Sequence, residues 1–360
     1  MLPEKSTLSQ FLIETRRHHP EAVGDLNSLI FEVALAVKRI AVRVAQNQFT
    51  GGESYGITNV QGEPQHRLDA DANDILLRAT EWGGQTAGIV SEELAAPHRI
   101  PERFQRGKYL LCFDPLDGSG NIDVNLTVGT VFSVLRSPRP GEHATVEDFL
   151  QPGSNQVAAG YAVYGPATML VISVGTGVHG FTLDPTVGEF ILTHPDIRIP
   201  ASPNEFAINA SNSRFWEPGV RRYVEECLAG TTGPRKANFN MRWIAACVGE
   251  AHRILMRGGV YLYPQDRKNA AQGGRLRLLY EANPLAWLIE QAGGRASTGR
   301  CRILDVQPTD IHQRVGLIFG DAAEVERIEA YHREEGCTDE TECSGRDIPL
   351  YGSRGLFRSA

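Results

Sequence analysis

The sequence lacks the features that mark several common classes of protein. Its longest apolar runs fall short of the about 18 residues that a membrane-spanning helix needs, and its first residues lack the basic and apolar segments of a secretory signal. Acidic residues outnumber basic ones by 43 to 36, and the net charge of −7 disfavours nucleic acid as a partner. The six cysteines show no zinc-finger spacing. We therefore expect a cytoplasmic protein with reduced thiols, and neither nucleic acid nor a membrane as its partner.

The composition that is present is ordinary for a globular protein, with 41% hydrophobic and 22% charged residues. A chain of 360 residues can bury a sizeable core, either as one large unit or as two domains. Prolines gather at 195–203, which is the best candidate for a boundary. We predict an N-terminal domain over 1–198, a C-terminal domain over 199–336 and a tail over 337–360.

Hydrophobic periodicity outlines the main elements of each half. A helical period runs over 26–45, and a second helix is predicted to begin near Asp71, because aspartate is a common helix cap. Further along, 260–263 and 275–280 have the pattern of strands. The segment 283–291 has the pattern of a helix and is followed by two glycines that would end it.

The most informative stretch begins where one apolar run ends. Tyr109–Phe113 predicts a buried strand of a mainly parallel sheet, and Asp114 and Asp117 follow it directly. Ligands bind at the carboxyl ends of strands in open α/β sheets. Mg²⁺ takes carboxylate and carbonyl oxygens and leaves its other positions to water and phosphate. A metal site is one interpretation of the two aspartates, and a polar turn with capping aspartates is the other.

Small residues in the same stretch suit an anion. Gly118, Ser119 and Gly120 can bring backbone N–H groups close to a phosphate. One short segment could therefore supply metal ligands and a phosphate cradle together. It is not an EF-hand loop, because the alternating oxygen ligands and the terminal glutamate are missing.

Two more acidic blocks lie upstream. Glu92 and Glu93 end a short predicted strand and would point to opposite faces unless the strand stops between them. One of them could then ligate a metal while the other polarises water. In the earlier block we interpret Asp71 as a helix cap, and the roles of Asp69 and Asp74 stay open.

These blocks, in this order and with the string DPLDGS at 114–119, resemble class 1 fructose-1,6-bisphosphatase, a family of the Li⁺-sensitive, metal-dependent sugar and inositol phosphatases. The resemblance is collinear over roughly residues 10–335. It continues through Asn121–Asp123, Val128–Phe132, Ile208-Asn209, Met241–Trp243, Gly258–Pro264, Arg275–Glu281, Asn283-Pro284 and Gly293-Gly294.

The resemblance implies a fold, a reaction and an assembly. The fold would be a layered α-β-α-β-α arrangement, in which two sheets are sandwiched by helices. The N-terminal, regulatory-type domain would carry the acidic motifs, and the C-terminal domain would bind substrate. A homotetramer would hydrolyse the 1-phosphate of D-fructose 1,6-bisphosphate to fructose 6-phosphate and phosphate. Mg²⁺, or alternatively Mn²⁺, would be the cofactor, because paired metal ions activate water and clamp the attacking and leaving oxygens.

The resemblance also assigns roles near the reacting phosphate. The implied metal ligands are Glu92, Glu93, Asp114, the carbonyl of Leu116, Asp117 and Glu281. Glu93 and Asp74 would orient the attacking water, and Asp117 would contribute to catalysis as well as to metal binding. Asp117, Gly118, Ser119 and Gly120 would hold the phosphate that is removed.

The distal phosphate needs a cationic site that does not react. Asn209, Tyr263 and Arg275 match the family positions that hold the sugar and this phosphate. Arg242 matches a residue that reaches the active site of a neighbouring subunit. Animal members have lysine at position 275 and tyrosine at position 243, where this chain has arginine and Trp243. Arginine keeps the charge but binds phosphate through a planar fork.

Regulation follows the resemblance only in part. Lys108, Tyr109 and Arg136 match part of the AMP site of animal members, whereas 18–23 does not match the rest of it. The segment 137–156 contains no cysteine, so we expect no redox switch of the chloroplast type there.

Three alternatives to a fructose-bisphosphatase were weighed. The first is a sedoheptulose-1,7-bisphosphatase, or a dual enzyme of the Calvin cycle instead of gluconeogenesis, because one extra carbon needs only a roomier pocket. The second is a non-catalytic metal-binding regulator, which a lost ligand would favour, yet every implied acid is present. The third is an inositol monophosphate substrate, which Arg242 and Arg275 disfavour.

Overall fold

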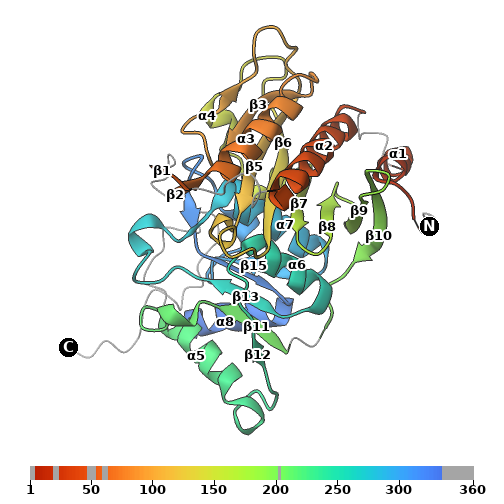
Figure 1. Cartoon of the computed structure of the whole chain (residues 1–360). Helices are drawn as coiled ribbons and strands as arrows, with labels where there is room; N and C mark the ends of the chain where they lie inside the picture. The colour runs from red at the N-terminus through yellow and green to blue at the C-terminus, as the bar shows by residue number, and fades with distance from the viewer. Residues whose placement is uncertain (1–4, 19–23, 47–53, 59–63, 202–203, 335–360) are drawn as a thin grey trace.

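The computed structural model describes residues 5–18, 24–46, 54–58, 64–201 and 204–334. The predicted tail over 337–360 lies outside the described residues. Two large β-sheets run through the described part of the chain, and helices lie on both sides of each sheet (Figure 1).

The larger sheet has eight strands in the order β10-β9-β8-β7-β6-β5-β3-β4. Its strands are β3 (Thr86–Ser91), β4 (His98–Arg99), β5 (Tyr109–Asp117), β6 (Val128–Arg136), β7 (Ala158–Tyr164), β8 (Thr168–Ser173), β9 (Val178–Asp184) and β10 (Glu189–Ile197). Only β3 and β5 pair in parallel, and every other neighbouring pair in this sheet is antiparallel. The prediction of a mainly parallel sheet was therefore wrong. The apolar run in β5 indicates that the strand is buried on both faces of the sheet, but it does not indicate the direction of the neighbouring strands.

The smaller sheet has five strands in the order β12-β11-β13-β17-β15. They are β11 (Glu205–Ile208), β12 (Asn240–Met241), β13 (Val260–Tyr263), β15 (Arg295–Ser297) and β17 (Leu317–Gly320). Two short pairs stand apart from the sheets, β1 (Ser54–Thr58) with β2 (Pro64–His66), and β14 (Leu276–Arg277) with β16 (Arg314–Val315).

Helices form three layers around the two sheets. The outer face of the larger sheet carries α1 (Leu8–His18), α2 (Gly24–Gln46) and α3 (Arg67–Thr80). Between the sheets lie α6 (Cys247–Arg257) and α7 (Asn283–Gln291), and the far face of the smaller sheet carries α5 (Pro218–Leu228) and α8 (Ala322–Glu334). The short helix α4 (Val146–Phe149) covers one end of the larger sheet. This order confirms the layered α-β-α-β-α fold.

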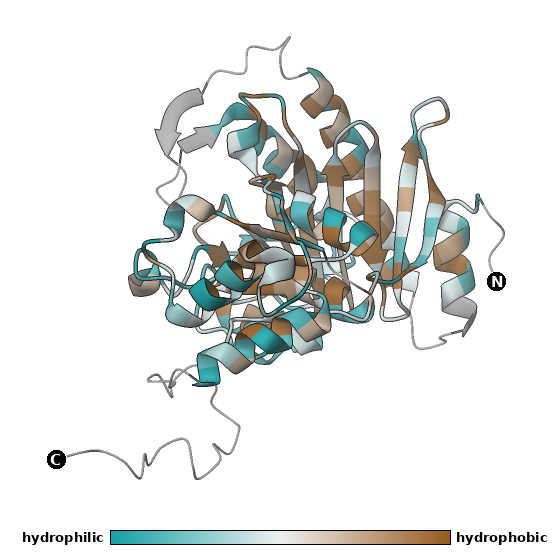
Figure 2. Cartoon of the chain, turned by 90° about the horizontal axis from the view of Figure 1, so that it is seen from below, coloured by the Kyte–Doolittle hydropathy of each residue, from teal (hydrophilic) through white to brown (hydrophobic). Residues whose placement is uncertain are grey.

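Each interface between layers has its own hydrophobic core. Phe113 and Phe132 face α2 and α3, whereas Val131 and Tyr161 on the opposite face pack with α6 and α7. Phe206 and Ile318 close the third core against α5 and α8. Successive residues of β6 point to opposite faces of the sheet, and nearly all of them are buried, so hydrophobic residues lie on both faces. Figure 2 shows largely hydrophobic central strands and more hydrophilic residues on the outer helices.

The helix α3 begins earlier than predicted. Its N-cap is His66, and the Asp69 side chain accepts a hydrogen bond of 2.9 Å from the His66 backbone N–H. The capping role expected for Asp71 therefore belongs to Asp69. Histidine is not a favoured cap, so no residue pattern marked the start of a helix at this position.

The predicted strand over 275–280 is also shorter than expected. The strand β14 contains only Leu276 and Arg277, and the next residues form a π-helical turn, η7 (Leu278–Ala282), which leads directly into α7. Glu281 therefore lies buried on a helical turn and not at the end of a strand. Single π-turns of this kind occur often at functional sites.

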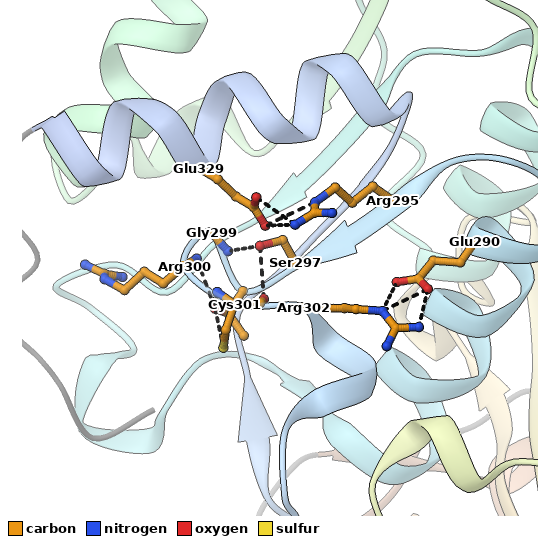
Figure 3. A network of polar contacts seen from close by, with 9 residues as sticks. Glu290, Arg295, Ser297, Gly299, Arg300, Cys301, Arg302 and Glu329 are labelled. Carbon is orange, nitrogen blue, oxygen red and sulfur yellow. Dashed lines mark hydrogen bonds and ion pairs between the residues drawn. The ribbon is translucent and has the colours of Figure 1, made fainter. Parts of the chain in front are cut away.

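Ion pairs hold α7 to the loop that follows β15, and α8 to β15 itself (Figure 3). Arg302 pairs with Glu290 of α7 at 2.6 Å, and Arg295 pairs with Glu329 of α8 at 3.0 Å. The loop itself is closed by a hydrogen bond of 3.0 Å from the Ser297 hydroxyl to the Cys301 carbonyl. Because α7 continues from η7, these contacts help to fix the turn that carries Glu281.

None of the helices within the described ranges combines the length and apolar character that crossing a bilayer would take.

Candidate active site

A cavity of about 320 Å³ opens where the end of β5, the N-terminus of α6 and the turn η7 meet. Its lining residues are Glu92, Asp114, Leu116, Asp117, Gly118, Ser119, Gly120, Asn209, Trp243, Ala245, Cys247, Tyr261, Tyr263, Arg275, Leu276, Arg277 and Glu281. Residues from both predicted halves of the chain contribute, and most of the residues expected at the site are among them.

Three buried carboxylates, which we call the acidic cluster, lie at the bottom of this cavity. Asp114, Asp117 and Glu281 each offer an oxygen, and these oxygens lie within 4.8 Å of one another. The first two residues come together because the pairing of β5 with β6 shifts register between them. The π-helical turn brings in Glu281 from the other half of the chain.

Backbone N–H groups fix the orientation of each carboxylate. Asp114 accepts a hydrogen bond of 2.9 Å from the N–H of Leu116, and Asp117 accepts one of 2.6 Å from Val248 in the first turn of α6. Glu281 accepts one of 2.6 Å from the backbone N–H of Arg277. Each bond leaves other carboxylate lone pairs for a ligand.

The side chain of Arg277 lies among these acids. Its guanidinium is 2.8 Å from Glu92 and 3.8 Å from Glu281, and the side chain is almost fully buried. Sequence reasoning missed this residue. The available signal was an arginine inside the apolar run over 276–280, because a buried arginine needs a carboxylate partner.

Burial and mutual repulsion make ionisation of the cluster costly. Burial, and then the charges of Glu92, Glu281 and Asp117, raise the pKa of Asp114 well above its ordinary value. Burial raises the pKa of Asp117 to about 7 and that of Glu281 to about 8, against the opposing effects of hydrogen bonds and Arg277. Like charges that are held together out of water are stabilised by a bound cation, and four close carboxylates with one arginine fit a hard divalent ion.

The turn after the acidic cluster has the form of an anion site. Gly118 has a left-handed backbone with φ of 77°, and a Cβ there would lie 2.5 Å from the Cβ of Ala246. The next residues form a single 3₁₀ turn, η2 (Ser119–Asn121), at the mouth of the cavity. The first N–H groups of a helical turn have no intrahelical acceptor, so those of Ser119 and Gly120 suit a phosphate.

Glu92 and Glu93 follow β3 in a braced turn. The strand ends at Ser91, whose hydroxyl donates to Asn73 on α3 at 2.7 Å and accepts from the backbone N–H of Glu93 at 3.3 Å. Glu92 lines the cavity, whereas Glu93 is half-buried beside it.

The structure does not bring Asp74 to this cavity. Its side chain is 62% exposed, and it pairs at 3.5 Å with Arg78 on the outer side of α3. Asp69 is 3% exposed, and its Oδ1 is buried without a hydrogen-bond partner. Burial raises the pKa of Asp69 to about 8, and the charges of Glu93 and Glu92 add to the rise. This placement corrects the expectation for Asp74, because α3 begins earlier than predicted and turns Asp69 inward.

The rest of the cavity lining is both polar and aromatic. Asn209, Tyr263 and Arg275 all line it, as expected. Trp243 stacks on Tyr261 with ring centroids 6.0 Å apart and planes at 9°, and it also lies 6.0 Å from Tyr263. The wall is therefore preformed by interlocked rings, and position 243 contributes a ring face.

Ala245 lines the same wall with a backbone that non-glycine residues rarely adopt, with φ of 62°. Such a conformation costs about 1–3 kcal/mol and is concentrated at functional sites. No sequence pattern pointed to this residue.

Arg242 does not line the cavity of its own chain. It follows the edge strand β12, its side chain is 50% exposed, and its Nε lies 3.4 Å from Glu205. Arg253 and Arg257 bind the same buried carboxylate at 2.8 and 2.7 Å. These contacts fix the base of the Arg242 side chain at the surface.

The residues expected at an AMP site lie together at the start of β5. Lys108 pairs with Asp25 of α2 at 2.7 Å, and Arg136 lies 6.0 Å above the ring of Tyr109. Part of the segment 18–23, which we expected to differ from the animal site, lies outside the described residues.

Comparisons with known proteins agree with this geometry. The model of the fructose-1-6-bisphosphatase N-terminal domain matches residues 6–195, and that of the fructose-1-6-bisphosphatase C-terminal domain matches residues 199–333. A class 1 fructose-1,6-bisphosphatase of Methylibium petroleiphilum is 61% identical over 357 residues, covering 99% of this chain and 98% of the relative. That of Hydrogenophilus thermoluteolus is 58% identical over 354 residues, covering 98% and 97%.

A solved structure is similar over nearly the whole fold. The crystal structure of Leishmania major fructose-1,6-bisphosphatase in holo form aligns with a TM-score of 0.84 and 37% identity, and the alignment covers 92% of this chain and 99% of that one. With two family models that together match most of the chain and relatives of about 60% identity, this chain belongs to the class 1 fructose-1,6-bisphosphatase family.

Proposed function

We propose that the cavity hydrolyses the 1-phosphate of D-fructose 1,6-bisphosphate with Mg²⁺ and releases fructose 6-phosphate and phosphate. One observation carries the proposal: a buried acidic cluster, a glycine-rich phosphate cradle and Arg275 all line the same cavity. A substrate with a phosphate at each end matches that distribution of charge.

The all-oxygen donor set fits Mg²⁺, and Mn²⁺ is the natural substitute. Glu92, Asp114, Asp117, Glu281 and the carbonyl of Leu116 would hold the metal ions. The ions supply an acidified water and charge neutralisation at the phosphoryl oxygens. Arg277 balances part of the acidic charge and would yield its contact with Glu92 as that carboxylate takes up a ligand role.

The groups of this chain orient the phosphate and the water. The N–H groups of Ser119 and Gly120 bind phosphate oxygens, and the φ of Gly118 sets their direction. Asp69 takes the place that we had assigned to Asp74. Its Oδ1 is buried without a hydrogen-bond partner, and the charges of Glu92 and Glu93 act on its carboxyl group, so Asp69 would accept a proton from the attacking water.

The other end of the substrate lies against the preformed wall. Asn209, Tyr263 and Arg275 bind the sugar and its distal phosphate, and the ring of Trp243 gives the wall its shape. Arg242 would reach the distal phosphate of a neighbouring subunit, because it directly follows the exposed edge strand β12, is half-exposed and does not line the cavity of its own chain. The active form is then an oligomer, and we propose the homotetramer.

We also propose that the chain divides into two domains near residue 198, where the two matched family models meet. We further propose a cytoplasmic location. AMP would bind where Lys108, Tyr109 and Arg136 gather, and it would have to displace Asp25 from Lys108. Displacement of a formed ion pair predicts weak inhibition.

Phosphate release tests the reaction directly. The purified protein, with and without Mg²⁺, is given fructose 1,6-bisphosphate, sedoheptulose 1,7-bisphosphate and an inositol monophosphate, each with and without AMP. We expect Mg²⁺-dependent release from fructose 1,6-bisphosphate and none from the inositol compound. Faster turnover of sedoheptulose 1,7-bisphosphate would transfer the proposal to that substrate, and metal-independent release would refute the mechanism.

Mixed oligomers test the shared site. Arg242→Ala subunits are combined with Asp117→Asn subunits, each of which is expected to have little activity alone. Partial recovery of activity is expected, because some cavities then combine an intact acidic cluster with a neighbour's intact Arg242. No recovery would place Arg242 outside the active site.

A further inference from the structure

We propose that His312 is a positioning residue that couples the two halves of the metal site, by tying the turn that carries Glu92 to the turn that carries Glu281. The inference rests on the metal site proposed above. It concerns residues that do not line the cavity, and it assigns a role to a hydrogen-bonded chain that crosses from one domain to the other.

The first link joins His312 to the turn of Glu281. The Tyr280 hydroxyl is 2.7 Å from Nδ1 of His312, and the two rings meet edge to face with centroids 5.9 Å apart and planes at 71°. Tyr280 is fully buried and directly precedes Glu281 in η7. A fixed Tyr280 ring therefore limits how far this π-helical turn can move.

The second link joins His312 to the turn of Glu92. Nε2 of His312 is 2.9 Å from the backbone carbonyl of Leu94, two residues after Glu92. The start of this turn is braced by Ser91, whose carbonyl accepts from the N–H of Leu94 at 3.3 Å. The bond from His312 holds its other end, so the turn is fixed on both sides.

The two hydrogen-bond partners of His312 determine which ring nitrogen carries the proton. A carbonyl only accepts hydrogen bonds, so Nε2 must carry the proton, and Nδ1 accepts from the Tyr280 hydroxyl. Burial lowers the pKa of His312, and the neutral ring satisfies both partners. The backbone N–H of His312 donates to Asp310 at 2.7 Å, which anchors the ring to its own loop.

The hydrogen bonds through His312 connect parts of the protein that are remote in sequence. Leu94 lies in the region matched by the N-terminal family model, whereas Tyr280 and His312 lie in the region matched by the C-terminal one. Metal ligands must be held within about 0.5 Å of their productive positions. A tether between the domains at this point would hold Glu92 at a constant distance from the rest of the acidic cluster.

The experiment measures metal affinity and not only turnover. Mn²⁺ is titrated into the full-length protein and free Mn²⁺ is followed by electron paramagnetic resonance, for wild type, His312→Ala and Tyr280→Phe. Loss of outer-sphere partners costs about 10–100-fold in metal affinity, and we expect a loss in this range for His312→Ala. We expect a smaller loss for Tyr280→Phe, which removes one hydroxyl and keeps the ring. The KM for fructose 1,6-bisphosphate at saturating Mg²⁺ should stay within about twofold, because neither residue lines the cavity.

Conservative variants separate the two links. In His312→Gln an amide N–H can still reach the Leu94 carbonyl, and we expect part of the Mn²⁺ affinity to return. In His312→Asn the shorter amide can replace only the Nδ1 contact with Tyr280, and we expect less recovery. Equal affinity in the alanine, glutamine and asparagine variants would contradict a role for the Leu94 link.

A second tyrosine–histidine pair in the protein, Tyr161 and His252, provides a matched control. The Tyr161 hydroxyl is 3.0 Å from Nδ1 of His252, and these rings also meet edge to face, at 6.0 Å and 82°. Neither residue lines the cavity. We expect His252→Ala to lower the melting temperature without changing Mn²⁺ affinity.

The outcomes distinguish this inference from the proposed function. If Asp117→Asn abolishes Mn²⁺ binding while His312→Ala binds Mn²⁺ as wild type does and only melts earlier, the tether is refuted and the metal site stands. If Asp117→Asn binds Mn²⁺ normally, the metal site itself is wrong. Weaker Mn²⁺ binding in His312→Ala but not in His252→Ala is the result that the tether predicts.

Discussion

Aspartates lie on both sides of helix α3 and differ in what they can do. On the outer side, α2 and α3 form a groove of about 710 Å³, whose charged lining residues are Lys38, Arg39, Arg43, Asp71, Asp74 and Arg78. On the inner side, Asp69 is buried, close enough to Glu92 and Glu93 for their charges to raise its pKa. The outer groove has more than twice the volume of the inner cavity, which holds the acidic cluster, yet we place the chemistry in the inner one.

The difference lies in how charge is balanced. In the outer groove each aspartate has its own arginine, Asp71 with Arg43 and Asp74 with Arg78, and both pairs are partly open to solvent. Exposed pairs of this kind contribute little to stability or binding. In the inner cavity the acids outnumber the cations and water is largely excluded. Uncompensated buried charge therefore identifies the site better than cavity size does.

The largest expected effect is on the inner side. Asp117→Asn removes a predicted metal ligand, and we expect kcat to fall by more than the about 100-fold that loss of an outer-sphere partner can cost. Phosphate release at saturating Mg²⁺ measures this, and circular dichroism checks that the variant is folded. Turnover close to wild type would remove the acidic cluster from the mechanism.

The next prediction compares the two sides of α3 directly. Asp69→Asn removes the proposed proton acceptor and should lower kcat by about 100-fold or more, which is the usual contribution of a general base. Asp74→Asn is the matched control on the outer side, and kcat should stay within about twofold of wild type, because the exposed Asp74 side chain pairs with Arg78 and does not line the cavity. The reverse result would restore the role that the sequence suggested for Asp74.

The same comparison can be made with arginines. Arg275→Ala should raise the Kd of fructose 1,6-bisphosphate by about tenfold or more, because hydrogen bonds to charged groups are worth about 1.5–3 kcal/mol. The Kd of fructose 1-phosphate, which lacks the distal phosphate, should change little. Arg78→Ala on the outer side should leave both unchanged. Equal losses for the two ligands would remove the distal-phosphate role from Arg275.

The smallest predicted effect is on stability and depends on pH. Folding raises the pKa of Asp117 from 3.8 to about 7 and that of Glu281 from 4.5 to about 8. The folded state therefore binds protons that the unfolded state has lost, so this contribution to stability is complete at acid pH and disappears as the pH rises through about 7 to 8.

The metal-free protein should accordingly melt at a lower temperature at about pH 8.5 than at about pH 6. Mg²⁺ should restore more stability at the higher pH, because it replaces the lost protons. Burial raises the pKa of Glu32 to about 7 and that of Asp69 to about 8, so these two groups add to the same dependence, whereas the lowered pKa values of Glu205 and Asp148 act only at acid pH. A melting temperature without Mg²⁺ that is independent of pH in this window would contradict the buried, like-charged site.

Sequence patterns located elements well where local periodicity determines structure. The predicted strand over 260–263 and helix over 283–291 have the bounds that the structure gives, and α2 exceeds its prediction by a few residues. The prediction of strand direction was wrong because the direction depends on pairing with strands far along the chain. Burial on both faces of β5 produces the same apolar run that is typical of a parallel sheet.

The site was predictable in its residue types and less so in its geometry. The DPLDGS string predicted Asp114, Asp117 and the start of the cradle, and the resemblance implied Glu281. The structure gathers these residues in one cavity. The exchange of Asp74 for Asp69 was missed because an atypical cap at His66 hid the start of α3 and left Asp69 outside the predicted helix. Within the helix, Asp69 shares the buried face of Ala72 and Leu76. Arg277 was missed because a π-helical turn, which has no periodic signature, follows a strand of two residues.

The most direct test of the account is the position of bound metal. Crystals grown with Mn²⁺ can be measured at a wavelength where manganese scatters anomalously. The account predicts anomalous peaks between the carboxylates of Asp114, Asp117 and Glu281, with Arg277 displaced from Glu92. Peaks that appear only in the outer groove, or an acidic cluster that holds no ion at saturating Mn²⁺, would contradict it.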